Sequence, residues 1–151
     1  MRKGELLEKM LVLMVNAHAG QFDRGGKPYA LHPLMVLNLV GNDDEELQCI
    51  ALGHDIIEDT KTTYQDLVDL GMTQRIIDGI KSVTKMPGET DDEYKAKVMS
   101  NVDGMIVKKA DLTHNSDIRR LKGVREKDID RMAKYHRFYL QLEAKLEEMK
   151  K

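Results

Sequence analysis

A stretch that turns from apolar to charged within a few residues constrains the fold of this chain most. Residues 47–53 (Leu-Gln-Cys-Ile-Ala-Leu-Gly) are predicted to form a helix that is apolar on nearly every side, as buried helices are. If the helix continues, side chains four positions apart share a face, which gives two neighbouring pairs: His54 with Glu58, and Asp55 with Asp59. Buried carboxylates are unfavourable unless they are paired or bind a metal. The stretch therefore predicts a metal and water site, and the alternative is a helix end that emerges into solvent.

The composition fits one globular domain. The chain has 151 residues, of which 41% are hydrophobic and 33% are charged, which allows a sizeable core and argues against disorder. A net charge of −2 offers no basic surface for nucleic acid, and no apolar run approaches the length that spans a bilayer. The single cysteine, Cys49, cannot form an internal disulfide, and two glutamates precede the first apolar run. We therefore expect a cytoplasmic protein without a signal peptide.

Apolar residues recur at helical spacing between clear breaks, which predicts an all-α fold. Helices are expected over residues 5–20, 33–41, 44–60, 63–70, 73–83, 91–101, 106–121 and 126–151. We expect residues 1–151 to form a single domain, with its motifs within about 5–121. The C-terminal helix, about 126–151, either packs on that domain or mediates self-association, and the sequence leaves both options open.

Two further segments place polar side chains on helix faces that should be buried. His32 opens a helix next to a glycine-rich loop, where it is either a ligand or a capping residue. Asp111, His114 and Asn115 fall at i, i+3 and i+4 on one core-facing stripe, where polar groups need partners or a metal. Such imidazoles and aspartates form a mixed N/O donor set suited to Mn²⁺, Fe²⁺ or Zn²⁺. His18, on an apolar face, is better interpreted as a buried, hydrogen-bonded histidine than as a ligand.

Four short motifs occur in order along the chain. They are Ala17-His18-Ala19-Gly20-Gln21, Pro28-Tyr29-x-x-His32-Pro33, His54-Asp55-x-x-Glu58-Asp59-Thr60 and Ala110-Asp111-x-x-His114-Asn115. Together they resemble the HD-type hydrolase domain of RelA/SpoT proteins, and the resemblance spans about residues 5–121. The length is similar to that of the small stand-alone alarmone hydrolases. The resemblance implies a compact helical HD-domain phosphohydrolase that removes the 3′-pyrophosphate from guanosine tetra- or pentaphosphate.

The resemblance also implies roles for individual residues. The metal, usually Mn²⁺, with Fe²⁺, Zn²⁺ and Mg²⁺ as alternatives, would be held by His32, His54, Asp55 and Asp111. The attacking water would be activated or oriented by Glu58 and Asp59. Tyr29 and Asn115 would lie near the nucleotide, and its phosphates would be neutralised by a choice among Arg24, Lys27, Lys108 and Lys109. A bound cation can lower the pKa of its water toward about 7, and a nearby carboxylate can relay a proton.

Three departures from the family pattern fall among the residues expected to contact the nucleotide. Asp23 stands where the family places an arginine that packs on the guanine base, and Leu112 replaces another arginine. Ser116-Asp117-Ile118 replaces Met-Arg-Thr. Two other functions therefore stay open: a phosphohydrolase for another nucleotide or phosphorylated metabolite, and a non-catalytic sensor of metal and nucleotide. Intact Glu58 and Asp59 argue against the sensor. The expected partner is a small nucleotide, with no nucleic acid or membrane, and a homo-oligomer is compatible with the sequence.

Overall fold

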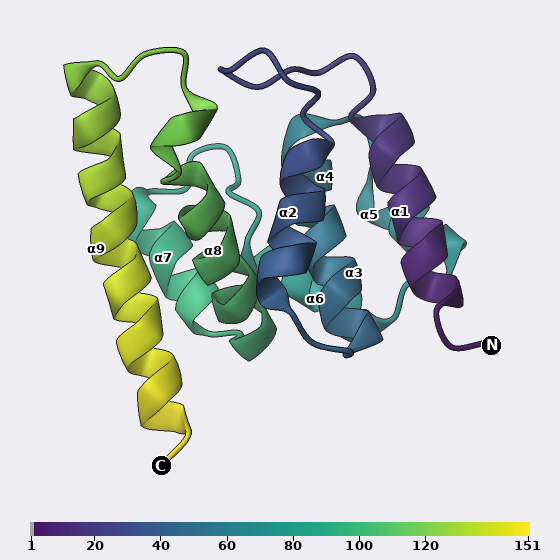
Figure 1. The fold of residues 1–151 in the computed structure, drawn as a ribbon. Coiled ribbons are helices and arrows are strands. Elements are labelled where there is room, and N and C mark those ends of the chain that lie inside the picture. The colour runs from purple at the N-terminus through teal and green to yellow at the C-terminus, as the bar shows by residue number, and fades with distance from the viewer. Residues whose placement is uncertain (1) are drawn as a thin grey trace.

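The computed structural model describes residues 2–151 and consists of helices joined by short loops (Figure 1). In chain order these are α1 (Glu5–Ala17), α2 (Leu31–Val40), α3 (Glu45–Gly53), α4 (Ile56–Asp59), α5 (Tyr64–Leu70), α6 (Gln74–Ser82), α7 (Asp91–Met99), α8 (Val102–Asn115), the 3₁₀ turn η1 (Ile118–Arg120) and α9 (Glu126–Met149). Within residues 2–151 extended pairing is limited to an isolated bridge between Phe22 and Pro28. The predicted all-α class is confirmed.

Helix α3 lies at the centre of the larger hydrophobic core. Its residues 47 and 49–53 are buried, and the helix packs against α1, α2, α6 and α8. The side chain of Asp44 accepts a hydrogen bond from the backbone N–H of Leu47 and caps the helix N-terminus. The close packing extends to Gly53, where an added Cβ would lie 2.9 Å from Ile80 Cδ1. The prediction of a buried central helix is therefore confirmed.

The prediction that this helix continues through residue 60 is wrong. Helix α3 ends at Gly53, and α4 starts at Ile56 after a break at His54 and Asp55. Adjacent side chains in a continuous helix point about 100° apart, which would direct these two to different faces. At the break they converge instead, and His54 Nε2 lies 2.9 Å from Asp55 Oδ2.

Other helix ends differ from expectation because backbone and capping groups of the adjoining loops form the hydrogen bonds there. Helix α1 ends at Ala17, and Gly20, with a φ of +86°, belongs to the turn beyond it. Helix α2 starts at Leu31, before Pro33, because its first N–H groups bond to carbonyls of residues 28 and 29. Helix α8 ends at Asn115 rather than continuing to residue 121. Asp117 then adopts an extended conformation, and its side chain caps η1.

Helix α8 forms a wall between two hydrophobic clusters. One face contributes to the larger cluster around α3, and the other face contributes Met105 and Leu112 to a smaller cluster with Val98 of α7. Phe138 and Leu142 of α9 complete the smaller cluster, so α9 packs along α8, as Figure 1 shows. The C-terminal helix therefore packs on the domain, the first of the two options that the sequence left open. In residues 2–151 no helix combines the length and apolar character needed to cross a membrane.

Candidate functional site

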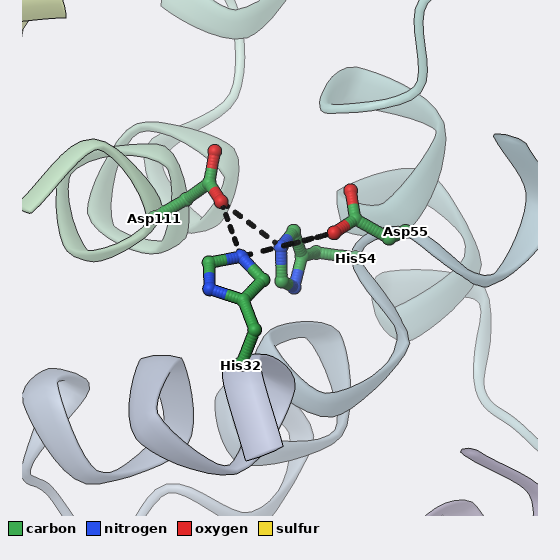
Figure 2. A group of neighbouring side chains, drawn as sticks. All are labelled: His32, His54, Asp55 and Asp111. Carbon is green, nitrogen blue, oxygen red and sulfur yellow. Dashed lines mark hydrogen bonds and ion pairs between the residues drawn. The ribbon is translucent and has the colours of Figure 1, made fainter. Parts of the chain in front are cut away.

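Four side chains from three parts of the chain meet where α2, α3 and α8 approach one another (Figure 2). His32 lies in the first turn of α2, His54 and Asp55 occupy the break after α3, and Asp111 lies on α8. One nitrogen or oxygen from each lies within 4.8 Å of the other three. Asp55 is partly exposed, and the other three side chains are buried. The structure thus brings together all four residues that the motifs suggested as metal ligands, which we refer to as the metal cluster.

The spacing of the donor atoms fits a single divalent ion. Asp111 Oδ1 lies 2.8 Å from His32 Nε2 and 3.2 Å from His54 Nε2. Asp55 Oδ2 lies 2.9 Å from His54 Nε2 and 3.8 Å from His32 Nε2. Metal–ligand bonds of about 2.1 Å place neighbouring donors about 3.0–3.4 Å apart. The three shorter distances lie within about 0.2 Å of this range, and Asp55 Oδ2 would move closer to His32 Nε2 to complete the set.

Both imidazoles are oriented by a partner on the side away from the cluster. His54 Nδ1 lies 2.7 Å from the carbonyl of Ala51, so it carries the proton and donates it, which directs Nε2 to the cluster. His32 Nδ1 lies 2.7 Å from His114 Nδ1. Burial and the charge of Arg120 lower the pKa of His114 to about 4, so its neutral ring can accept the hydrogen from His32. This gives His114 an orienting contact with a cluster residue.

The charges in the metal cluster favour a cation at its centre. Burial disfavours the protonated form of His54, but the carboxylates of Asp55 and Asp111 outweigh this and raise its pKa well above the ordinary value. Burial likewise opposes ionisation of Asp111, yet Lys108 and the two histidines hold its pKa well below the ordinary range. Metal binding displaces protons from such ligands, so a divalent ion can replace the proton that the raised pKa keeps on His54.

Lys108 and Tyr29 are tied to the cluster carboxylates. Lys108 Nζ donates to Asp111 Oδ2 at 2.9 Å, and the Asp111 charge outweighs burial and raises the pKa of the lysine. The hydroxyl of Tyr29 donates to Asp55 Oδ2 at 2.5 Å, and burial together with the Asp55 charge raises its pKa. Both were predicted as substrate-binding residues, and in the structure both hold metal-cluster oxygens in place.

Glu58 and Asp59 lie on α4, just beyond the cluster. Their side chains are exposed, and Glu58 Oε1 accepts a hydrogen bond from the backbone N–H of Lys85 at 2.8 Å. The carboxyl of Asp59 is partly desolvated and faces the charges of Asp55 and Glu58, which raises its pKa to about 6. Near neutral pH this group is therefore ionised and close to its proton-binding range.

His18 is buried beside Tyr29, with 5.1 Å between the ring centroids. Its Nδ1 bonds to Gln21 Oε1 at 2.8 Å, which confirms the prediction of a buried, hydrogen-bonded histidine. The other nitrogen, Nε2, has no hydrogen-bond partner among the described residues. Gln21 in turn donates to the carbonyl of Asp59 at 2.8 Å, so the loop after α1 is tied to the end of α4.

A cavity of about 300 Å³ reaches residues that contact the metal cluster, although none of the four cluster residues lines it. Tyr29 and Asn115 line it and also bond to cluster carboxylates, Tyr29 to Asp55 and Asn115 Nδ2 to Asp111 Oδ1 at 3.0 Å. Arg24 lines the same cavity. Lys27 lines a neighbouring cavity of about 560 Å³ that reaches His32 and His114.

Sequence reasoning missed part of the wall of the 300 Å³ cavity. The missed residues are the polar or charged Arg120, Arg131 and Tyr135 and the apolar Phe22, Leu121 and Met132. Arg120 lies in the basic run 119–127, and Arg131 and Tyr135 lie on the charged α9, so no spacing signal marks them. Conversely, Leu112 is buried against α9, so this departure from the family pattern lies in the hydrophobic core and not in the cavity wall.

Comparison with known proteins connects this geometry to one family. No family model matches the chain. A GTP pyrophosphokinase of Myxococcus xanthus is 31% identical over 126 residues, covering 74% of this chain and 17% of the relative. A guanosine-3′,5′-bis(diphosphate) 3′-pyrophosphohydrolase of Haemophilus influenzae is 31% identical over 131 residues, covering 79% and 19%. The bifunctional (p)ppGpp synthase/hydrolase SpoT of Escherichia coli is 30% identical over 121 residues, covering 72% and 17%.

The chain thus spans less than a fifth of the length of these relatives. A solved structure matches it more completely. That protein, described as a metazoan orthologue of SpoT that hydrolyses ppGpp, has a TM-score of 0.75 and 21% identity. The match covers 98% of this chain and 94% of the other, which shows a shared fold. From the ordered motifs, the identities and this fold, the chain is a homologue of the HD-type hydrolase domain of the RelA/SpoT family.

Proposed function

We propose that this protein is a metal-dependent phosphohydrolase that removes the 3′-pyrophosphate from guanosine tetra- or pentaphosphate. The observation that carries the proposal is the metal cluster, with four donor atoms within 4.8 Å and a cavity at its side. Two of the relatives are named for this hydrolysis or for synthesis and hydrolysis together, and the similar fold belongs to a protein described as hydrolysing ppGpp.

Mn²⁺ is the proposed ion, with Fe²⁺, Zn²⁺ and Mg²⁺ as alternatives. His32, His54, Asp55 and Asp111 would hold it, and this mix of two nitrogen and two oxygen donors suits a borderline divalent metal. When bound, the ion supplies Lewis-acid stabilisation of a phosphoryl oxygen and makes a water more acidic. Because the donors are already oriented by Ala51, His114 and Lys108, little rearrangement would be needed on binding.

Glu58 and Asp59 are the proposed groups that orient the attacking water and receive its proton. Asp59 suits the second task because its pKa of about 6 lies near the working pH, where a general base is most effective. Glu58 suits the first because the Lys85 N–H holds its carboxylate. General base catalysis of this kind contributes about 10²–10⁴-fold in rate.

The cavity beside the metal cluster is the proposed nucleoside site. Tyr29 and Asn115 would contact the part of the nucleotide nearest the cleaved bond, since both bond to cluster carboxylates. Arg24 lines the cavity and Lys27 lines the next one, so these two cations are placed to neutralise phosphates. Lys108 would act through Asp111 by holding its carboxylate.

A second candidate is hydrolysis of another nucleotide or phosphorylated metabolite by the same cluster. It is favoured by Asp23, a carboxylate in the wall of the 300 Å³ cavity at the place where the resemblance puts a base-stacking arginine. The non-catalytic sensor is the third candidate. No observation favours the sensor, and the presence of Glu58 and Asp59 argues against it because a sensor needs neither residue.

The cellular setting is proposed from the single cysteine and the site chemistry. Cys49 is buried, and its burial raises the pKa of the thiol to about 12, so it behaves as a small apolar side chain in a reducing cytoplasm. We propose that the partner is a small nucleotide and that the protein acts without nucleic acid or membrane. Self-association is a further proposal.

The test is product analysis of Mn²⁺-loaded protein incubated with guanosine tetraphosphate, GTP, deoxynucleoside triphosphates and simple phosphate esters. Release of pyrophosphate and GDP from guanosine tetraphosphate, lost after chelation and in Glu58→Gln, is expected. Hydrolysis of another compound, without hydrolysis of guanosine tetraphosphate, would contradict the proposed substrate and support metal-dependent phosphohydrolase activity. Inactivity on every substrate with Mn²⁺ bound stoichiometrically would contradict the hydrolase proposal and favour a sensor.

A further inference from the structure

An ion pair joins the loop after α1 to the segment after α8. Arg120 Nη2 lies 3.4 Å from Asp23 Oδ2, and both side chains are mostly buried, at 20% and 15% exposed. The two backbones are also in close contact, because a Cβ added at Gly25 would lie 2.2 Å from the carbonyl oxygen of Arg120. Figure 1 shows the loop reaching across to the chain that follows α8. The loop after α1 therefore packs directly against η1.

The other end of the Arg120 guanidinium leads to the metal cluster. Nη1 donates to Asn115 Oδ1 at 3.1 Å, and Asn115 Nδ2 donates to Asp111 Oδ1 at 3.0 Å. Asp111 Oδ1 is the oxygen that also contacts His32 and His54. A continuous series of contacts thus runs from Asp23 through Arg120 and Asn115 to a carboxylate of the cluster.

We propose that Arg120 is a positioning residue of the metal cluster, which fixes the Asn115 amide against Asp111 and is itself held by Asp23 of the loop. The inference rests on the metal binding proposed above. An amide side chain has two orientations, and a guanidinium can only donate hydrogen bonds, so Arg120 selects the one with oxygen toward itself. The NH₂ group then points at Asp111 and limits the rotation of its carboxylate.

The arrangement accounts for the departure at residue 23. The resemblance implies an arginine at position 23, whereas here this position carries a carboxylate and a guanidinium, that of Arg120, reaches it from η1. Asp23 also organises its own loop, because Oδ1 accepts a hydrogen bond from the backbone N–H of Lys27 at 2.9 Å. Loop conformation and orientation of the cluster carboxylate are therefore linked through one guanidinium.

A plain helix cap is the competing interpretation. Arg120 Nη1 also donates to the carbonyl of His114 at 3.1 Å, in the last turn of α8, as basic side chains at helix C-termini commonly do. A cap would contribute to stability alone. A positioning residue would change metal affinity as well, and groups that orient metal ligands typically contribute about 10–100-fold to it.

The experiment measures Mn²⁺ affinity by titration calorimetry and, separately, thermal unfolding of the metal-free protein. Arg120→Gln is expected to bind Mn²⁺ about 10–100-fold more weakly than wild type. The matched control is Arg119→Gln, next in the chain, whose side chain is 87% exposed and, among residues 2–151, pairs only with Asp117. Its Mn²⁺ affinity is expected to stay within about twofold of wild type. Asp23→Asn should have a smaller effect than Arg120→Gln, because Arg120 keeps its bond to Asn115.

Two further variants separate positioning from folding. Arg120→Lys keeps a positive charge beside Asp23 but cannot span both Asp23 and Asn115, so it should fold and still lose Mn²⁺ affinity. If Arg120 acts through Asn115, the double variant Asn115→Ala/Arg120→Gln should bind Mn²⁺ no more weakly than Asn115→Ala alone. The absorption spectrum of Co²⁺-loaded protein should change in Arg120→Gln, since the orientation of a ligand changes.

The outcomes distinguish this inference from the proposed function. Wild-type affinity in both Arg120→Gln and Arg120→Lys would overturn the positioning role and leave the proposed hydrolase intact. Reduced melting temperature with unchanged Mn²⁺ affinity would show a helix cap only. Failure of the wild-type protein to bind Mn²⁺ or Co²⁺ at all would overturn the metal-dependent function, and the positioning role with it.

Discussion

The metal cluster and the rim of the adjoining cavity differ in how closely they follow the family pattern. Every cluster donor atom has a hydrogen-bond or ion-pair partner, and all four cluster residues match the motifs. At the rim, by contrast, Asp23 and Asp117 replace expected arginines, while Arg119 and Arg120 pair with them. In both places each charge has a partner, and at the rim both members of a pair differ from the family pattern together. This chain therefore departs from the family pattern at the cavity rim and keeps it at the four cluster residues.

The largest effect should follow from removing a cluster imidazole. His54→Ala leaves Asp55 and Asp111 facing each other without the cation between them and removes one of four donors. We expect loss of stoichiometric metal, measured by elemental analysis after dialysis, and with it loss of turnover. The control is His136→Ala on the exposed side of α9, which should keep its metal. Retained metal in His54→Ala would contradict the assignment of the cluster.

Glu58→Gln should affect turnover and spare the metal. The neutral amide binds the attacking water more weakly than the carboxylate and no longer orients it for proton transfer to Asp59, so kcat should fall by about 10²–10⁴-fold while the Mn²⁺ content remains that of wild type. Steady-state kinetics and elemental analysis on the same sample check both parts. Glu148→Gln, at the exposed end of α9, is a matched control. An unchanged kcat would remove Glu58 from the mechanism.

Rim cations should contribute less, and mainly to binding. Arg24→Gln removes one charge-assisted contact to a phosphate, for which we expect about a tenfold rise in KM with kcat nearly unchanged. The effect should shrink as salt increases, because Arg24 is exposed and salt screens its charge. Lys134→Gln on α9 serves as the comparison. A large fall in kcat would place Arg24 at the reacting phosphoryl group instead.

The smallest effect is a pH dependence of stability that belongs to Asp59. Its pKa is about 6 in the folded metal-free protein and near 3.8 when unfolded, so the folded state binds the proton more tightly. Stability should therefore fall as pH rises from about 4 to 6, and Asp59→Asn should reduce this slope. Urea unfolding of the metal-free proteins across that range tests the difference. Identical slopes would show that Asp59 is not perturbed.

Local sequence predicted the helices well where capping and turn residues act locally. Thr63 and Thr73, where the expected helices 63–70 and 73–83 begin, cap α5 and α6, and Gly71 ends α5 with a φ of +99°. The errors, at residues 54–60 and 116–121, lie where side chains reach across the fold. The helix after Gly53 breaks at His54 and Asp55, where His54 Nε2 contacts both Asp55 and Asp111 of α8. No local pattern encodes that contact.

The sequence by itself determined the residues of the cluster, through motifs that resemble those of the RelA/SpoT hydrolase domain, and the helical class. Imidazoles and carboxylates on apolar helix faces require partners wherever they are buried, and helical periodicity follows from neighbours three and four positions away. Only the tertiary structure decided what surrounds them: Lys108 on Asp111, Leu112 in the core against α9, and Arg120 between Asp23 and Asn115. Some of these contacts join residues that are distant in sequence, and others depend on which side of α8 faces the site. The packing of the helices decides both features, and the spacing of residues along the chain does not encode them.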